Sequence, residues 1–347
     1  MQKRIFNKEN IIILLIFFSN TLYSASAEYK NKAAPKKMYS WMLIPVSARG
    51  AGIGQGIVAI VNNANTVFWN PGGIAFLEDN ICVSYSYNPL LNPLSKNWLW
   101  NDEFHNLAFN TKISKNIITG LNYKYFSYGY SFVKDYSIGI LFNYKKGDIG
   151  FGINTNLYSL YYAQNNPVLS FDFGVLYSKD LNRNTLSYIK NISFGISILN
   201  ISSGVDYSTG HFKRALPFNL RIGYSITLIY AKENNEKHPF VITHNMEYSD
   251  VLNSDKAFYR SDTGGGIEFQ FYRLLCIRLG YHRRGYSDSS IKGITYGTGF
   301  IFPLKYIFNN LKMSITYDFA LYPWMPVLNW KKDEYYSIHS FGLKYRF

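Results

Sequence analysis

Hydrophobic and polar residues alternate with a period of two through most of the chain. Positions 81–88 read ICVSYSYN, so that Ile, Val and Tyr alternate with Cys, Ser and Asn. Such alternation places the two kinds of side chain on opposite faces of a β-strand. The pattern recurs often enough to predict 14 strands, at 81–88, 106–113, 120–125, 136–144, 149–156, 169–177, 192–198, 220–230, 240–248, 267–271, 275–282, 294–302, 311–319 and 335–347.

The polarity of the two faces bears on the class of fold. One face is Ile, Leu, Val, Phe and Tyr, and the other is Gly, Ser, Asn, Thr and isolated charges. A soluble sandwich buries its apolar face, whereas a transmembrane barrel turns it to lipid, and alternation alone does not separate these classes. An even strand number, aromatic residues at strand ends and a final strand ending on Phe347 favour the membrane. The prediction is an all-β fold, a 14-stranded antiparallel transmembrane β-barrel with an N-terminal Gly-rich plug.

The N-terminus has the pattern of a secretory signal peptide. Three basic residues before position 9 precede the apolar stretch 11–18 and the small residues Ala25-Ser26-Ala27. This order is typical of a signal cleaved after Ala27, and the alternative is a buried N-terminal helix. We divide the chain into a signal peptide (1–27), a basic N-terminal tail (28–45), a periplasmic plug (46–79) and the barrel (80–347).

The predicted plug is rich in glycine. Glycines alternate at 50, 52, 54 and 56, which does not match a G-x-G-x-x-G phosphate loop. Their spacing of four allows a short helix to pack close to another backbone, as a plug in a narrow barrel requires. The Asn-Pro and Gly-Gly pairs at 70–73 predict a turn, which we place at the junction of plug and barrel. The residues assigned to plug and junction are Arg49, Gly50, Gly52, Gly54, Trp69, Asn70, Pro71 and Gly72.

Composition changes how the length is interpreted. A chain of 347 residues is usually two domains, but no predicted connection is large enough for a second one. The 18% aromatic content fits a lipid-facing coat with girdles. The formal net charge is +14, which becomes 14 − 2 = +12 without the signal peptide. Because the basic residues are dispersed, we expect no nucleic-acid partner and instead expect contact with outer-membrane lipid and lipopolysaccharide.

No catalytic or metal-binding motif occurs in the sequence. The 6 histidines have no metal-ligand spacing, and neither H-E-x-x-H nor G-x-S-x-G is present. We therefore expect no enzymatic activity, no metal and no cofactor. Cys82 and Cys276 fall on inward faces of the first and eleventh strands, where we expect two free thiols although oxidising surroundings permit a bridge.

Charged residues on the polar faces predict a network in the lumen. Glu268 and Arg278 share one face of a tight hairpin, so Arg278 should lie opposite Glu268 or Gln270. The expected network contains Arg221, Glu268, Arg278, Asp318 and Arg346. Two roles remain open: holding strands and plug in register, or guiding a ligand head group.

The connections indicate an orientation and a surface for partners. If the plug starts in the periplasm, connections after even strands are periplasmic and short, as 114–116, 145–147 and 273–274 are, although 180–187 and 232–237 are longer. Most connections after odd strands are longer. In the last of these, Trp324 and Met325 are candidates for partner contact, and an equally good alternative is a girdle anchor at the membrane interface.

Several segments resemble the PorV/PorQ family of outer-membrane barrels, which is related to FadL-type fatty-acid channels. The resemblance rests on SARGAGIG at 47–54 followed by FWNPGG at 68–73. It continues in order with YKYFSYG at 123–129, FG to LNI at 194–201, LPFNLRIG at 216–223, GGIE at 265–268, IRLGY at 277–281 and GTG at 297–299. Gly73 stands where Ala or another small residue is usual, and we expect little steric effect.

The resemblance implies a FadL-like barrel in the outer membrane of a Gram-negative-type bacterium. PorV-like members serve type IX secretion, in which they receive secreted cargo and pass it to the attachment machinery, so secretion-system proteins or cargo are the implied partners. The alternative is a FadL-like channel for fatty acids or other hydrophobic small molecules, and a purely structural barrel is a third hypothesis. We favour secretion, because the middle and late segments are more PorV-like and long surface loops are lacking.

Overall fold

A computed structural model describes most of the predicted barrel and plug. The described residues are 40–61, 63–89, 103–128, 133–161, 163, 167–181, 189–202, 205–206, 213–214, 216–230, 240–252, 259–286, 290–308, 312–323 and 335–346. The predicted signal peptide, the predicted tail up to residue 39, Trp324, Met325 and Phe347 lie outside them.

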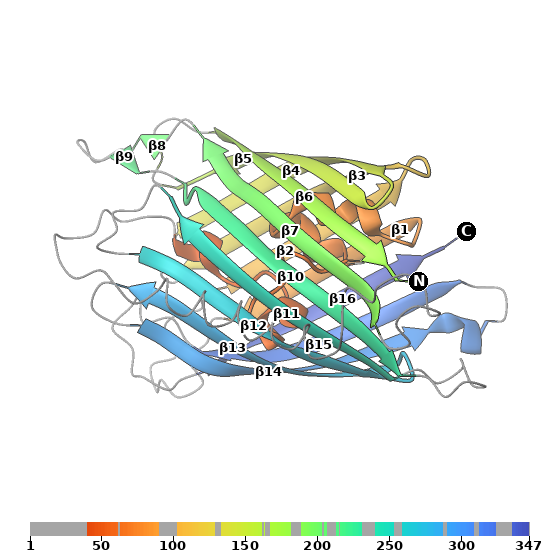
Figure 1. The fold of residues 1–347 in the computed structure, drawn as a ribbon. Helices are drawn as coiled ribbons and strands as arrows, with labels where there is room; N and C mark the ends of the chain where they lie inside the picture. Colours follow the sequence, from red (N-terminus) through yellow and green to blue (C-terminus); the bar gives the residue numbers. More distant parts are fainter. Residues whose placement is uncertain are drawn as a thin grey trace, which may run out of the picture.

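Fourteen strands form one closed antiparallel barrel (Figure 1), as the alternation predicts. Strand β1 pairs with β2 on one side and closes the barrel against β16 on the other. The strands are β1 (Ile81–Pro89), β2 (Glu103–Lys112), β3 (Ile117–Tyr128), β4 (Val133–Lys146), β5 (Ile149–Ser159), β6 (Val168–Asp180), β7 (Ile189–Ser202), β10 (Asn219–Tyr230), β11 (Phe240–Val251), β12 (Tyr259–Phe271), β13 (Leu275–Tyr286), β14 (Ser290–Pro303), β15 (Met313–Pro323) and β16 (Tyr335–Tyr345).

A small hairpin lies between β7 and β10. It consists of β8 (Val205–Asp206) and β9 (Lys213–Arg214), which pair with each other outside the barrel sheet. Periodicity did not predict it, because two residues are too few to show alternation.

The exposure of the strands is reversed relative to a soluble protein. Along β6, Leu169, Phe171 and Phe173 are exposed, whereas the alternate Ser170 and Asp172 are buried. A water-soluble fold does the opposite, since burying apolar surface drives its folding. Apolar residues outside and polar residues inside are the arrangement of a transmembrane barrel. No helix among the described residues is long and apolar enough to cross a membrane.

The two ends of the barrel differ in their connections. We call the short-turn end the one that holds residues 113–116, 147–148 and 272–274, and the opposite end the long-loop end. Gly147, Tyr272 and Arg273 have φ angles of 60°, 54° and 60° in these tight turns. Short turns face the periplasm in outer-membrane barrels, and we expect the short-turn end to face it here.

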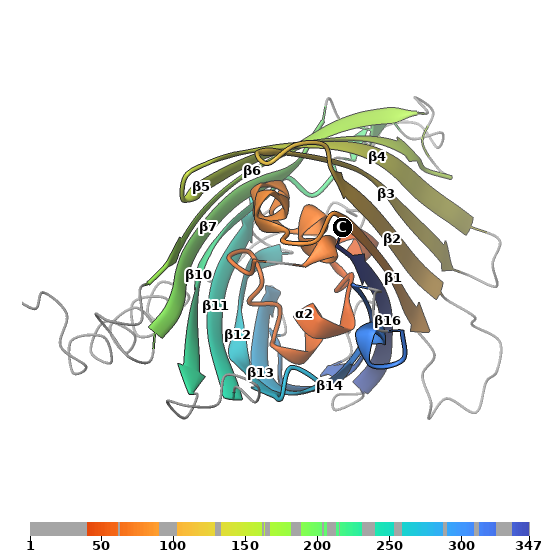
Figure 2. The same ribbon diagram turned by 90° about the vertical axis from the view of Figure 1, so that its right-hand side faces the viewer.

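Residues 40–80, here called the luminal segment, run through the inside of the barrel (Figure 2). The segment comprises η1 (Ser40–Leu43), α2 (Ala48–Gly52), η2 (Ala64–Phe68) and η3 (Pro71–Phe76). Helix α2 contacts β13 to β16, and η3 contacts β3 to β7. The luminal segment therefore crosses the lumen before it enters β1.

The luminal segment begins at residue 40, before the predicted plug (46–79), and its first residues lie at the long-loop end of the barrel. Trp41 is buried at the long-loop end, where its indole stacks on Phe126 and donates a hydrogen bond of 3.0 Å to Asp135. Residues 41–45, which the sequence places in the basic N-terminal tail (28–45), are therefore packed in the luminal segment. The lysines of the predicted tail all precede residue 40, and the apolar run after it can be buried.

Local sequence signals set the ends of the luminal helices. Ser47 caps α2 by accepting a hydrogen bond of 3.2 Å from the Gly50 N–H, and Asn70 caps η3 in the same way through Gly72. Helix α2 ends before Gly54 and Gln55, which have φ angles of 66° and 64°. Gly54 therefore lies in a turn rather than in the helix, and its left-handed backbone suits glycine.

Candidate functional site in the barrel lumen

The luminal segment and the barrel wall meet through glycine on both sides. A Cβ added at Gly52 would lie 3.0 Å from the Gly297 Cα, and one at Gly56 would lie 2.9 Å from the Gly265 Cα. A Cβ at Gly280 would collide with the Gly54 backbone. The wall glycines that approach the backbone of the segment are Gly150, Gly152, Gly174, Gly195, Gly264, Gly266, Gly280 and Gly297. We call this set the glycine seat.

The glycine seat explains the predicted plug glycines and was not itself predicted. Its members occur on β5, β6, β7, β12, β13 and β14, mostly at inward positions of the alternation. Without side chains, two backbones can approach much more closely than packed side chains allow. Glycine recurring on the polar face of strand after strand was the sequence signal that could have revealed the seat.

Trp69 and the Asn70–Gly72 turn join the luminal segment to the wall. Trp69 is 2% exposed, and a Cβ at Gly50 would lie 3.1 Å from its ring. The Asn70 side chain donates hydrogen bonds to the carbonyl oxygens of Val58 at 2.8 Å and Val175 at 3.1 Å. A Cβ at Gly72 would lie 2.6 Å from the carbonyl oxygen of Gly174. Trp69 and the Asn70–Gly72 turn therefore contact both the luminal segment and the barrel wall.

A side chain at position 73 would have a larger steric effect than the sequence indicated. A Cβ at this position would collide with the methyl group of Thr66, which is itself fully buried. The expectation of little steric effect is therefore wrong, because η3 folds back against η2 at this point.

An ion-pair chain links α2 to three strands. Arg49 donates to Glu268 from Nε at 3.0 Å and from Nη2 at 2.7 Å, and Arg278 Nε donates to Glu268 at 2.6 Å. Arg278 Nη1 is 2.7 Å from Asp318. The register pairs Glu268 directly with Arg278, as the hairpin predicted.

The other two predicted network residues lie elsewhere. Arg221 forms an ion pair with Glu247, whose other oxygen accepts hydrogen bonds from the N–H groups of Ile57 at 3.0 Å and Val58 at 2.8 Å. Arg346 follows β16 at the rim, where it lies 3.1 Å from both Glu78 and Asp79. The structure therefore separates the five residues into three groups, because Arg221 on β10 pairs across to β11 and Arg346 lies beyond the end of β16.

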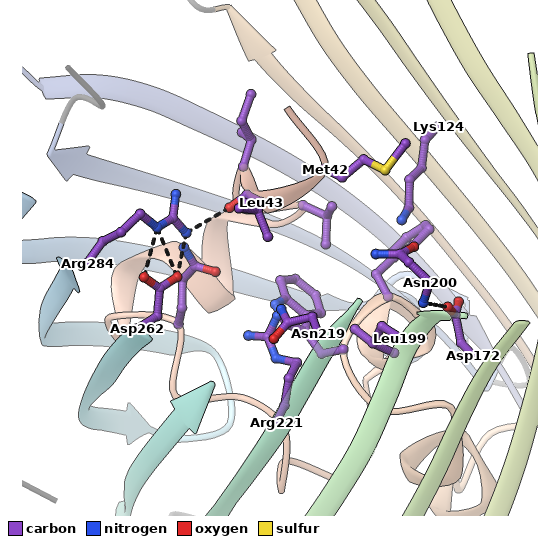
Figure 3. A pocket seen from close by; sticks show the side chains of 15 residues that line it. Met42, Leu43, Lys124, Asp172, Leu199, Asn200, Asn219, Arg221, Asp262 and Arg284 are labelled. Atoms are coloured by element: carbon purple, nitrogen blue, oxygen red, sulfur yellow. Dashed lines mark hydrogen bonds and ion pairs between the residues drawn. The ribbon is translucent and has the colours of Figure 1, made fainter. Parts of the chain in front are cut away.

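A polar pocket lies at the long-loop end of the lumen (Figure 3). Arg284 donates to Asp262 at 2.7 Å and to the Leu43 carbonyl oxygen at 3.0 Å, which ties η1 to β12 and β13. Asp172 accepts from the Asn200 N–H at 2.7 Å. The Lys124 ammonium lies 5.1 Å from the centre of the Phe68 ring. Charged groups thus surround this pocket even though Met42 and Leu43 form part of its lining.

A second cavity, the short-turn chamber, lies between the luminal segment and β1, β12, β13, β14, β15 and β16. It has a volume of about 250 Å³, and its lining includes Arg49, Asn65, Thr316, Asp318 and Lys344. Both cysteines are buried free thiols, as expected. Among the described residues, no three His, Cys, Asp or Glu side chains form a set that could hold a metal ion.

These features define a class of protein. A closed barrel of 14 antiparallel strands with an apolar exterior and a polar lumen occupied by its own N-terminal segment is an outer-membrane β-barrel. Residues 28–140, about a third of the chain, match the family described as "Type IX secretion system protein PorV". The chain therefore carries a PorV-family domain, which confirms the family resemblance. The match includes the luminal segment and β1 to β3, whereas the later segments that resemble the family lie outside it.

Two solved structures illustrate what the chain is similar to. A FadL homologue from Pseudomonas aeruginosa is 10% identical, with 88% of this chain and 99% of that chain covered and a TM-score of 0.41. The toluene transporter TodX from Pseudomonas putida is 9% identical, with 85% and 95% covered and a TM-score of 0.41. No curated protein sequence matches the chain.

Proposed function

We propose that this barrel serves type IX secretion as a closed outer-membrane component whose luminal segment acts as a plug. The observation that carries the proposal is the glycine seat, together with the PorV-family match. Close contact between two backbones leaves little room for a substrate to pass along that side of the lumen. The barrel would then act through its outer surface and loops, by receiving secreted cargo or handing it to other secretion proteins.

The polar character of the lumen favours secretion over uptake of hydrophobic molecules. Sites for apolar ligands are lined mainly by hydrophobic side chains. Here both luminal cavities contain ion pairs, Arg284 with Asp262 in one and Arg49 with Glu268 in the other. Apolar cargo would have to displace water from these charges, which is costly.

A variant in which a disulfide fixes the luminal segment to the barrel wall distinguishes a role in secretion from a role in uptake. The Ala48 N–H donates a hydrogen bond of 2.8 Å to the Ser340 Oγ, so α2 contacts β16 here and this pair is the one we choose for an engineered disulfide. In a Cys82→Ala, Cys276→Ala background, the Ala48→Cys, Ser340→Cys variant should complement a deletion strain for surface display of type IX cargo. The two single-cysteine variants are the controls. If the oxidised double variant loses cargo display and reduction of its disulfide restores it, the luminal segment must move during function. That result would contradict a static plug.

Deletion of the gene that encodes this protein tests whether the barrel serves secretion or uptake. We expect the deletion strain to lose surface display of type IX cargo and to take up radiolabelled fatty acid at the normal rate. Intact display with reduced uptake would instead support the channel. Intact display and intact uptake would leave a purely structural role for the barrel.

We also propose Trp324 and Met325 as a partner-contact loop between β15 and β16. A Trp324→Ser, Met325→Ser variant should keep normal levels of folded barrel and lose cargo display. Trp330→Ser, in the same connection, is the matched control for loss of an indole. If the double variant instead lowers the amount of folded barrel and Trp330→Ser does not, the pair is a membrane anchor.

A further inference from the structure

The luminal segment fills only one side of the lumen at the short-turn end. Ile118, Leu141 and Leu176, which point inward from β3, β4 and β6, are 3%, 1% and 0% exposed. On the opposite side, Thr316, Asp318 and Lys344 point inward from β15 and β16 and stay partly exposed. The reason is that η3 packs on β3 to β7, so the short-turn chamber remains open beside it.

One edge of the Arg49 guanidinium is available to this chamber. Arginine has five N–H donors in a planar fork. Glu268 takes the edge formed by Nε and Nη2, at 3.0 and 2.7 Å. No hydrogen bond from Nη1 is formed within the described residues, and the side chain is 22% exposed although its neighbour Arg278 is only 2% exposed. The edge formed by Nη1 and Nη2 has the geometry that binds a carboxylate through two hydrogen bonds.

The charge of the lining points to the same chemistry. The chamber is lined by three cations, Arg49, Arg278 and Lys344, and by two carboxylates, Glu268 and Asp318, which leaves a formal excess of one positive charge. A net positive lining favours an anionic ligand over a neutral one.

We propose that the short-turn chamber binds a small carboxylate. Its two oxygens would accept hydrogen bonds from the open edge of Arg49. The carboxyl end of a peptide and a free hydroxy acid both have this chemistry, and a volume of about 250 Å³ accommodates one or two residues or a small acid. Binding does not depend on the proposed role in secretion, since it is a property of the purified barrel.

Calorimetric titration of the purified full chain in detergent at low salt tests the proposal. The probes are acetyl-Ala-Ala with a free carboxylate, the same dipeptide as its amide, and lactate. We expect the acid dipeptide to bind and the amide to bind at least ~10-fold more weakly, because the amide lacks the charge that pairs with Arg49. Binding of lactate as tight as that of the dipeptide would assign the site to free acids, and weaker binding would assign it to peptide ends. Equal binding of acid and amide, or no binding of either acid, would overturn the proposal.

Two variants keep the test independent of folding. Arg49→Gln should weaken acid binding by at least ~10-fold, but it also disturbs the ion-pair chain. Thr316→Trp fills the chamber without touching that chain and should abolish binding, with Thr298→Trp on the outer face of neighbouring β14 as the matched control. Unchanged acid binding in a folded Thr316→Trp barrel would show that the site is not in the chamber.

Discussion

Glu247 holds the middle of the luminal segment, and replacing it with Gln should release that part. One oxygen of the carboxylate accepts from the N–H groups of Ile57 and Val58, and the other pairs with Arg221. The two side chains are 4% and 10% exposed, so solvent screens the pair little. Glu247→Gln leaves the Arg221 charge buried without a partner, which costs about 3–5 kcal/mol.

A double variant separates the cost of the unpaired Arg221 charge from the cost of the altered hydrogen bonds. In Arg221→Met, Glu247→Gln the unpaired charge is gone, and Gln can still accept from Ile57 and Val58. The remaining loss is the difference between charged and neutral hydrogen bonds, about 1–2 kcal/mol. The double variant should therefore be more stable than Glu247→Gln alone.

The assay is maleimide labelling of a cysteine placed at Ala59, in a background without Cys82 and Cys276. Ala59 is 1% exposed, and its carbonyl oxygen accepts from Ser193 at 2.7 Å, so labelling requires local release. Glu247→Gln should speed labelling by about 10²–10⁴-fold, and the double variant by about tenfold. Equal rates in the single and double variants would refute the reasoning, because the loss would then not come from the unpaired Arg221.

Three further predictions concern other parts of the lumen. Gly280→Val should prevent the luminal segment from seating, seen as loss of the folded, heat-modifiable band on a gel, whereas Gly293→Ala, whose added Cβ has the Pro323 and Tyr335 side chains as its nearest neighbours, should keep that band. Trp69→Ala should lower the free energy of unfolding by about 3–5 kcal/mol in a denaturant titration, and Trp69→Phe by less; equal losses would show that ring volume is not what matters. Arg284→Met should free η1, so that Trp41 fluorescence shifts to longer wavelength, and an unchanged spectrum would show that Arg284 does not hold η1.

The barrel could be predicted because its signal is local and repeated. On β6, every second residue from Leu169 to Tyr177 is apolar and faces outward, and the structure has the same alternation. Registers between neighbouring strands follow from the same alternation at short turns, which is why Glu268 opposite Arg278 was predictable. Predicted strand ends differ from the structure by several residues, for example at the start of β12, because polar strand ends extend beyond the membrane without a periodic signal.

The sequence by itself determined the class of fold, the number of strands and the segment that enters the lumen. These follow from period-two alternation and from glycine spacing, which are properties of residues close together in the chain. Only the tertiary structure decided that Arg221 pairs with Glu247 rather than joining the network of Glu268 and Arg278, that Arg346 stays at the rim, and that eight wall glycines seat the luminal segment. Those contacts join residues tens to hundreds of positions apart, and they depend on how the closed barrel orients each strand around the segment it encloses.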